Sequence, residues 1–191
     1  PMDERSFRHA NRLVGNNDVT AALELTVSGP TLRFHAPAVI ALSGAAMPML
    51  LEGVAIAHDT AIAVEAGQML SIGAISGAGQ RSYLAVAGGF AAPVGLGSRA
   101  TFGLGQFGGH ATGTLKAGQV LHLARAAQAE AQPAAAAAPL TRHWNVGVLY
   151  GPHGAPDFFL PEDIEILFST DYEVHFNSAR TGVRLIGPAP K

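Results

Sequence analysis

The sequence has no cysteine among its 191 residues. This absence excludes disulfide bridges, thiolate metal ligands and a thiol nucleophile, although it does not fix the cellular compartment. Charged residues are also few, at 14%, and the formal net charge is −2. Because the chain has no basic excess to neutralise phosphates, we do not expect it to bind nucleic acid.

Long apolar runs are missing too. The sequence contains no stretch of about 18 apolar residues, the length that crosses a bilayer. It also lacks the basic start and apolar middle of a signal peptide. We therefore expect a cytoplasmic protein without a membrane partner. Hydrophobic residues make up 48% of the chain, which favours a compact globular fold over general disorder.

The spacings of familiar catalytic centres are absent as well. None of the eight histidines forms an i, i+4 pair, and no cluster with Asp or Glu has metal-site spacing, so we expect no metal. Residues 103–108 formally match the dinucleotide fingerprint. No helix pattern follows them, so we interpret this segment as a loop. A Ser/His/Asp triad stays open, because triads are recognised by geometry.

Residues 3–14 have the periodicity of an amphipathic helix. Asp3 is a suitable N-cap, because its carboxylate would lie at the positive end of the helix dipole. Apolar residues recur on the face that would pack against a core, namely Phe7, Ala10, Leu13 and Val14. Arg5, Arg8 and Arg12 lie near the other face, and we interpret Arg8 and Arg12 as part of a solvated basic surface.

The chain from residue 21 to residue 123 is typical of short strands punctuated by Gly or Pro. The spacing leaves no room for regular βαβ units, so it predicts a mainly β unit, a sandwich or a barrel. The expected strands are residues 23–27, 31–34, 39–42, 61–64, 69–75, 82–87 and 120–123.

An Ala- and Pro-rich segment, residues 124–140, has the composition of a linker. It would separate a first unit, residues 1–123, from a second, residues 141–191. In the second unit we expect strands at residues 144–150 and 172–176 and a helix at residues 161–169. The buried face of that helix would consist of Ile164, Leu167 and Phe168.

The strongest candidate site is the stretch from residue 176 to residue 188. Arg180 and Arg184 are rigid forks of donors that suit a planar carboxylate, carbamate or ureido group. Asn177 can donate and accept at once, which suits a urea-like amide, and Ser178 and Thr181 add hydroxyls. A turn with a solvated arginine accounts for the same composition equally well.

A second polar stretch follows Gly97. Ser98, Arg99 and Thr101 combine two hydroxyls with an arginine after a glycine that permits a tight turn. Such a turn can bind an anion through backbone N–H groups and the guanidinium. The same residues also suit an ordinary polar turn, and the sequence alone does not separate these two interpretations.

Three segments in the same order resemble the allophanate hydrolase subunit 2 family: residues 1–16, 81–101 and 177–188. That family includes the carboxyltransferase domain of urea carboxylase, which also occurs within urea amidolyase, and one subunit of the ATP-dependent 5-oxoprolinase. The combination of residues 153–159 with residues 176–182 is more similar to the urea carboxylase branch. Ala179 departs from that branch, where a second asparagine is usual.

The resemblance implies a cyclophilin-like β-barrel with a few short helices, followed by the start of a second, similar barrel. It also implies an enzyme that transfers a carboxyl group from carboxybiotin to urea and so makes allophanate. On this basis Asn177, Arg180 and Arg184 are the expected catalytic residues. The expected substrate-binding residues are Ser98, Arg99, Thr101, Ser178 and Thr181.

The same resemblance implies biotin held on a separate carrier domain and ATP used by a separate biotin carboxylase domain. A companion half, similar to allophanate hydrolase subunit 1, would complete the carboxyltransferase, so this fragment is expected to be inactive alone. Two alternatives remain at this point: the related subunit of 5-oxoprolinase, or a non-catalytic barrel that binds or regulates a partner.

Overall fold

The computed structural model describes residues 1–103, 105–110, 113–124, 139–178 and 182–190. The chain forms two compact units, and the boundary between them lies between Arg142 and His143. Most of the predicted linker, residues 124–140, lies outside the described residues, so its character stays a prediction. Within the described ranges, no helix combines the length and the apolar character that a membrane crossing requires.

The first unit begins with helix α1, Glu4–Leu13. Asp3 caps it as the sequence predicts: its Oδ1 accepts a hydrogen bond from the backbone N–H of Ser6 at 3.1 Å, and its Oδ2 accepts one from the Ser6 hydroxyl at 2.5 Å. These bonds satisfy donors that the first turn of a helix leaves unpaired. The helix ends at Leu13 with Val14 as its C-cap, and the Gly15 N–H donates to the carbonyl of Arg12 at 3.0 Å.

Eight strands form two four-stranded sheets in which every pair is antiparallel. The first sheet has the order β1 (Leu23–Thr26), β8 (Arg81–Val86), β3 (Ala38–Gly44) and β6 (Ile62–Val64). The second has the order β2 (Thr31–Arg33), β7 (Met69–Ile72), β4 (Met49–Leu51) and β5 (Val54–Ile56). The unit is therefore mainly β, as predicted.

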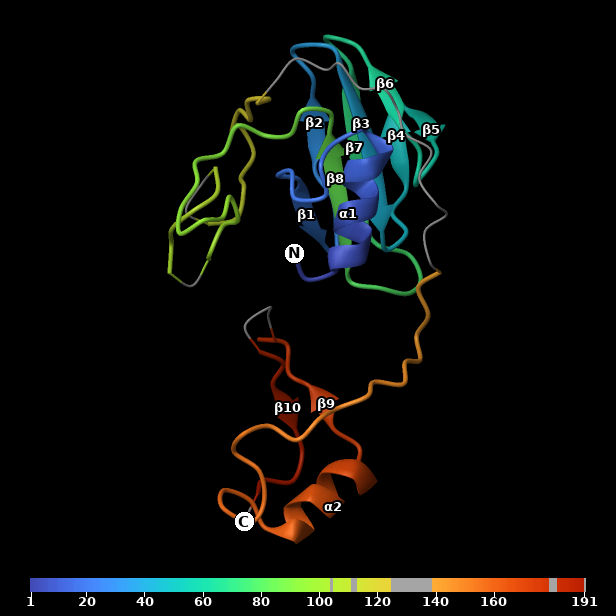
Figure 1. The fold of residues 1–191 in the computed structure, drawn as a ribbon. Coiled ribbons are helices and arrows are strands. Elements are labelled where there is room, and N and C mark those ends of the chain that lie inside the picture. Colours follow the sequence, from blue (N-terminus) through green and yellow to red (C-terminus); the bar gives the residue numbers. More distant parts are fainter. Residues whose placement is uncertain (104, 111–112, 125–138, 179–181, 191) are drawn as a thin grey trace. The chain divides into compact units, whose positions relative to one another are not determined.

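Strands β3 and β8 separate two apolar layers, because successive side chains of a strand point to opposite faces. Ile40 and Leu84 belong to the core shared by both sheets, together with Leu70 of β7. Ala41 and Ala85 belong to the layer beneath α1. The unit thus has three layers, with α1 covering the outer face of the first sheet (Figure 1). Small alanines at this contact let the helix lie close to the sheet.

Most of the strands predicted from the sequence of the first unit are present in the structure. Six of the seven runs predicted in the first unit contain strands, but residues 120–123 form only an isolated bridge between Leu123 and Phe90. The sequence does not predict strands β4 and β5. Each is a run of three apolar residues, on either side of the turn at Glu52, so neither shows an alternation of apolar and polar residues.

The second unit contains helix α2, Pro161–Ser169, and the antiparallel pair β9 (Glu173–Val174) and β10 (Leu185–Ile186). The helix occurs where the sequence predicts it, with Asp163 Oδ2 accepting from the Leu160 N–H at 2.9 Å. Its predicted buried face is wrong: Leu167 and Phe168 are exposed, whereas Asp163 is buried.

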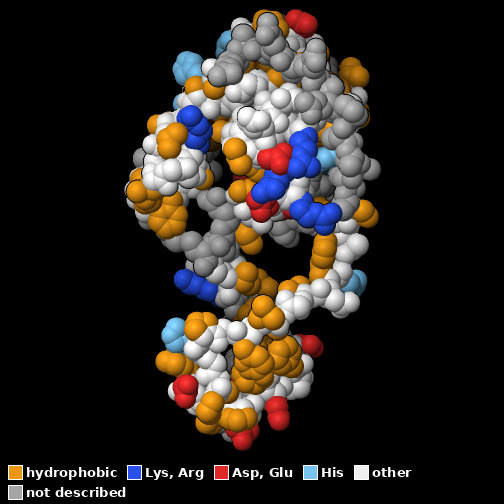
Figure 2. Space-filling view, in the orientation of Figure 1, with side chains coloured by type: hydrophobic (Ala, Val, Ile, Leu, Met, Phe, Trp, Pro, Cys, Tyr) orange, Lys and Arg blue, Asp and Glu red, His pale blue; other side chains and the backbone are white. Residues whose placement is uncertain are grey.

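Residues 144–150 are all described, yet they form no strand, so that prediction is wrong too. Their alternating apolar side chains are exposed, Leu149 almost completely. Figure 2 shows hydrophobic side chains gathered on the visible face of this unit. An apolar pattern gives a strand only when a neighbouring strand supplies hydrogen bonds.

Candidate functional site

The loop that joins β9 to β10 brings predicted site residues together. His175 follows β9, and its backbone N–H donates to the carbonyl of Arg184 at 2.8 Å. This bond continues the register of Val174 opposite Leu185 by one further pair. The loop therefore leaves and returns at a fixed point, with His175 and Arg184 opposite each other at its base.

A tight turn follows His175. Its carbonyl accepts a hydrogen bond from the Ser178 N–H at 3.0 Å, and its ring Nδ1 accepts one from the Asn177 N–H at 3.0 Å. The His175 ring also stacks on Phe176, with centroids 4.3 Å apart. The backbone of Asn177 is thus fixed by a side chain two residues earlier, as in turns that Asx side chains make.

Ser178 connects this turn to the returning chain. Its hydroxyl oxygen accepts a hydrogen bond from the Arg184 N–H at 3.0 Å and lies 3.4 Å from the Arg184 carbonyl oxygen. Through His175, three of the predicted residues, Asn177, Ser178 and Arg184, therefore belong to one hydrogen-bonded group. Asn177 and Arg184 are exposed, so an amide and a guanidinium face solvent from adjacent chain segments. Arg180 and Thr181 lie outside the described residues.

Sequence reasoning missed His175, which it assigned only to a strand. A histidine ring nitrogen can accept a hydrogen bond from the backbone N–H two residues further on. Nothing in the sequence distinguishes that arrangement from a solvent-facing histidine at a strand end. The part that this residue plays in the loop becomes visible only through its contacts.

The second predicted group, Ser98, Arg99 and Thr101, lies in the first unit. Gly95 and Ser98 exchange backbone hydrogen bonds of 2.8 and 3.0 Å around Leu96 and Gly97, whose φ angles are 50° and 75°. Positive φ at both central residues is the geometry of a type I′ turn, and Gly97 adopts it without strain. The sequence prediction of a tight turn here is confirmed.

Two side chains of this group stabilise the turn itself. The Ser98 hydroxyl accepts from the Ala100 N–H at 3.0 Å, and the Arg99 guanidinium donates to the carbonyl of Ala92. Arg99 is nevertheless exposed, so donors that do not face Ala92 remain open to solvent. This group and the β9–β10 loop belong to different units.

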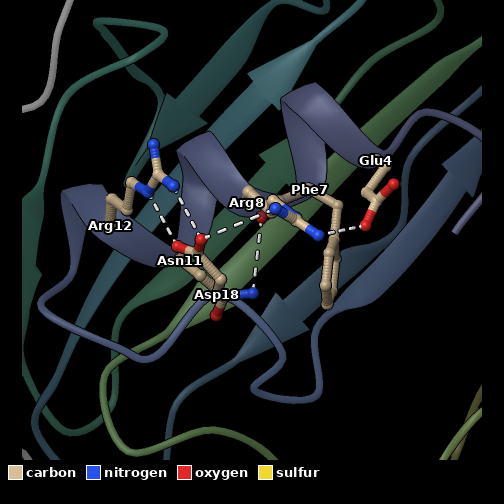
Figure 3. Close-up of polar contacts among 6 residues, drawn as sticks. All are labelled: Glu4, Phe7, Arg8, Asn11, Arg12 and Asp18. Atoms are coloured by element: carbon tan, nitrogen blue, oxygen red, sulfur yellow. Dashed lines mark hydrogen bonds and ion pairs between the residues drawn. The ribbon is translucent and has the colours of Figure 1, made fainter.

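Two asparagines fix the segment that leads from β8 towards Ser98. Asn11, fully buried, donates to the carbonyls of Phe7 at 3.3 Å and Thr20 at 3.0 Å; Figure 3 shows the first of these bonds. Asn16 donates to the Asn11 side-chain oxygen at 3.0 Å and to the carbonyl of Val86 at 2.8 Å. Its own side-chain oxygen accepts from the Gly88 N–H at 2.8 Å.

Two arginines on the basic face of α1 are paired with carboxylates. Arg12 makes a bidentate contact with Asp18, at 2.7 and 2.6 Å, and Arg8 pairs with Glu4 (Figure 3). Figure 2 shows these acidic and basic side chains side by side over the helix. The Arg12 hydrogen bond lowers the pKa of Asp18. Because the pairs are exposed, we assign this face a small contribution to stability.

A separate titratable cluster lies between α1 and the loop after β5. The Asp59 carboxylate accepts from His58 Nδ1 at 2.9 Å and lies 3.7 Å from His9 Nε2. Burial, the largest single effect, acts to raise the pKa of Asp59. Hydrogen bonding from His58 and Ser43 and the charges of the two histidines outweigh it and hold that pKa below its ordinary value. The Ser43 hydroxyl makes this contact without ordinary hydrogen-bond geometry.

The described part of the chain contains no group of three or more His, Cys, Asp or Glu side chains arranged to hold a metal ion. The described residues of the candidate site that face solvent are the amide of Asn177 and the guanidinium of Arg184. Such groups bind planar, partly negative oxygens through directed hydrogen bonds.

Comparison with known proteins gives consistent matches over the whole chain. The family model described as carboxyltransferase domain, subdomain A and B, matches residues 1–191. The urea amidolyase of Lachancea kluyveri is 45% identical over 204 aligned residues, which cover 100% of this chain and 11% of that protein. The crystal structure of the K. lactis urea amidolyase is similar with a TM-score of 0.88 and 44% identity, covering 100% of this chain and 12% of that chain.

A more limited similarity links the chain to another enzyme. A 5-oxoprolinase subunit of Escherichia coli (strain K12) is 38% identical over 100 residues, which cover 52% of this chain and 32% of that protein. Of the matched urea amidolyases, in contrast, the chain spans only about a tenth of the length.

Proposed function

Because this chain belongs to the carboxyltransferase domain family, subdomains A and B, we propose that it forms part of an enzyme that transfers a carboxyl group from carboxybiotin to urea, giving allophanate. The single observation that carries the proposal is the β9–β10 loop, where hydrogen bonds tie Asn177, Ser178 and Arg184 into one group. The similarity to urea amidolyases along the whole chain supports the choice of substrate.

The residues of this loop fit the ureido group of both reaction partners. Asn177 presents an exposed amide that can donate to a urea oxygen and accept from a urea nitrogen at the same time. Arg184 presents an exposed guanidinium that would stabilise negative charge developing on a planar oxygen. Ser178 holds the backbone of Arg184, so it orients the guanidinium instead of meeting the substrate first.

Biotin, when bound, supplies the activated carboxyl group. The residues of this chain would bind and orient urea and the ureido group of biotin. Two reactants that are already held in contact lose less entropy in reaching the transition state. Arg180 and Thr181 remain candidates for the same site. Ser98, Arg99 and Thr101 remain candidates for a second polar wall.

The proposal has an architectural part. The two four-stranded sheets would be the two halves of a cyclophilin-like barrel, and the β9–β10 unit would begin a second, similar barrel. A companion carboxyltransferase half, a biotin-carrier domain and an ATP-using biotin carboxylase domain would complete the enzyme in the cytoplasm. The small share of the urea amidolyases that this chain spans supports that division of labour.

The direct test uses the complete natural protein that contains this chain. We expect Asn177→Ala and Arg184→Lys each to lower allophanate formation from urea, bicarbonate and ATP by about a hundredfold, the effect of losing one well-placed donor. The lysine keeps the charge and loses the fork. ATP-dependent carboxylation of biotin should be unchanged, and Arg5→Ala, an exposed arginine on α1, is the matched control.

Full allophanate formation by both variants would remove this loop from the mechanism. One alternative rests on the similarity to the 5-oxoprolinase subunit over about half of the chain. ATP-dependent opening of 5-oxoproline by the same preparation, without carboxylation of urea, would favour that alternative. Activity in neither assay would favour a non-catalytic binding or regulatory unit.

A further inference from the structure

The ring of His175 acts as a hydrogen-bond acceptor in the β9–β10 loop. Its Nδ1 lies 3.0 Å from the backbone nitrogen of Asn177, which carries the donated hydrogen. A ring nitrogen accepts only when it carries no proton of its own. The observed contact therefore requires a neutral imidazole with its hydrogen on Nε2.

We propose that His175 is a positioning residue that holds Asn177 in place only while its ring is neutral, so that protonation of Nδ1 releases the Asn177 backbone. The inference deepens the proposed function and rests on it for its effect on carboxyl transfer. On protonation, Nδ1 becomes a donor facing another donor, the Asn177 N–H, and the contact changes from attractive to repulsive.

The remaining contacts of His175 predict which part of the loop responds. Its backbone N–H donates to Arg184 and its carbonyl accepts from Ser178, and neither bond involves the ring. The bonds between Ser178 and Arg184 are also independent of the ring. Protonation should therefore displace Asn177 while the base of the loop, where His175 and Arg184 pair, stays closed.

The surroundings of the ring permit this titration. His175 is half-buried, so solvent reaches it, and Phe176 covers one face of the ring. Arg184 lies directly opposite on the neighbouring strand segment, where paired side chains share a face. Glu173 lies two residues earlier on β9 and shares that face as well. These two neighbours carry opposite charges, one a carboxylate and the other a guanidinium.

Two substitutions of His175 distinguish the loss of its hydrogen-bond acceptor from the loss of its ability to be protonated. Asparagine can present its side-chain oxygen close to the position of Nδ1 but does not titrate, whereas alanine removes the acceptor. In the complete protein at about pH 8, we expect His175→Ala to lower kcat for allophanate formation by about tenfold, the loss of one hydrogen bond. His175→Asn should recover most of that loss. It should also lack the fall in kcat on acidification that we expect for the natural protein.

His153→Asn is the matched control, because His153 is another loop histidine of the same unit and packs its ring on Phe158. In His153→Asn, kcat should fall on acidification, as we expect for the natural protein. The proposed role of the ring is overturned if kcat of His175→Asn falls on acidification as it does for the natural protein. It is also overturned if His175→Asn is no more active than His175→Ala.

A measurement that does not depend on activity completes the test. In the ¹⁵N-labelled 191-residue chain, the His175 ring should show a proton on Nε2 and none on Nδ1 in mildly alkaline solution. The Asn177 amide resonance should then move with the same midpoint as the ring on acidification. A proton on Nδ1 under the alkaline condition, or an Asn177 amide that ignores the titration, would contradict the inference. If both NMR results hold while the complete protein does not carboxylate urea, the proposed function fails and the positioning role stands.

Discussion

Asn16 and Gly88 are 72 residues apart in the sequence and are joined by a 2.8 Å hydrogen bond from the Gly88 N–H to the Asn16 side-chain oxygen. The same side-chain amide donates to the carbonyl of Val86, so one side chain satisfies both a donor and an acceptor at the end of β8. The segment that follows α1 and the end of β8 are thereby held together.

Replacing Asn16 by alanine would leave the Gly88 N–H and the Val86 carbonyl without these bonds. We expect Asn16→Ala to lower the free energy of unfolding by about 2 kcal/mol, since unpaired, partly buried polar groups each cost about 1–3 kcal/mol. Urea denaturation with an unchanged slope would measure it. Asn17→Ala, an exposed neighbour, should change stability by less than about 0.5 kcal/mol. Equal effects of the two substitutions would contradict this role.

The phenol of Tyr83 should ionise only above the ordinary tyrosine pKa of 10.0. Burial is the main cause that raises its pKa, and the nearby Glu24 carboxylate adds to it. Because the folded state favours the neutral phenol, this contribution to stability is complete below the ordinary pKa of 10.0 and is lost as pH rises above it. Spectrophotometric titration of the phenolate absorbance in the natural protein and in Tyr83→Phe would test it. A Tyr83 phenol that ionises at or below pH 10.0 would count against the raised pKa.

Asp59 should contribute stability that acid removes. Its pKa is lowered in the folded protein, so the contribution is present above the ordinary value of 3.8 and is lost as pH falls below that value towards the folded-state pKa. We expect the unfolding free energy of Asp59→Asn to fall less steeply than that of the natural protein in this range. Asp171→Asn is the control, because Asp171 is exposed. Parallel pH profiles for the natural protein and Asp59→Asn would exclude the effect.

Gly89 follows the Asn16 contact and has a φ of 77°. A Cβ at this position would lie 2.3 Å from Cγ2 of Thr20, so Gly89→Ala adds a clash to the strain of a positive φ. Gly118→Ala, with a φ of 85° and open space around the added Cβ, carries the strain alone. We expect Gly89→Ala to lose at least about 1 kcal/mol more stability than Gly118→Ala. Thermal unfolding of both variants would measure the difference. Equal losses of stability would show that the Thr20 side chain moves to accommodate the added Cβ.

Much of the first unit follows from local patterns. The Asp3 cap and the apolar stripe that includes Leu13 define α1, and the alternation around Leu84 defines β8. The sequence did not reveal that Asn11 and Asn16 bond across to Thr20 and Val86, because those contacts depend on the packing of α1 against the sheet.

The second unit is predicted less well for a physical reason. The run from Trp144 to Tyr150 has a strand-like pattern, but the structure gives it no pairing partner among the described residues. The same limit applies to the candidate site: the roles of Asn177 and Arg184 stay predictions from side-chain chemistry. The contact of His175 needs coordinates, because accepting and solvated rings have the same sequence signature.

Helix α1 is attached to one strand at both of its ends. The Asp3 N–H donates to the Tyr83 hydroxyl at 2.7 Å near the start, and Asn16 reaches Val86 past the end. An α-helix turns by about 100° per residue. A one-residue insertion or deletion within α1 would therefore rotate Asn16 away from β8 even if the helix itself survived. Among related proteins, the spacing between these two positions should tolerate substitutions far better than changes in length.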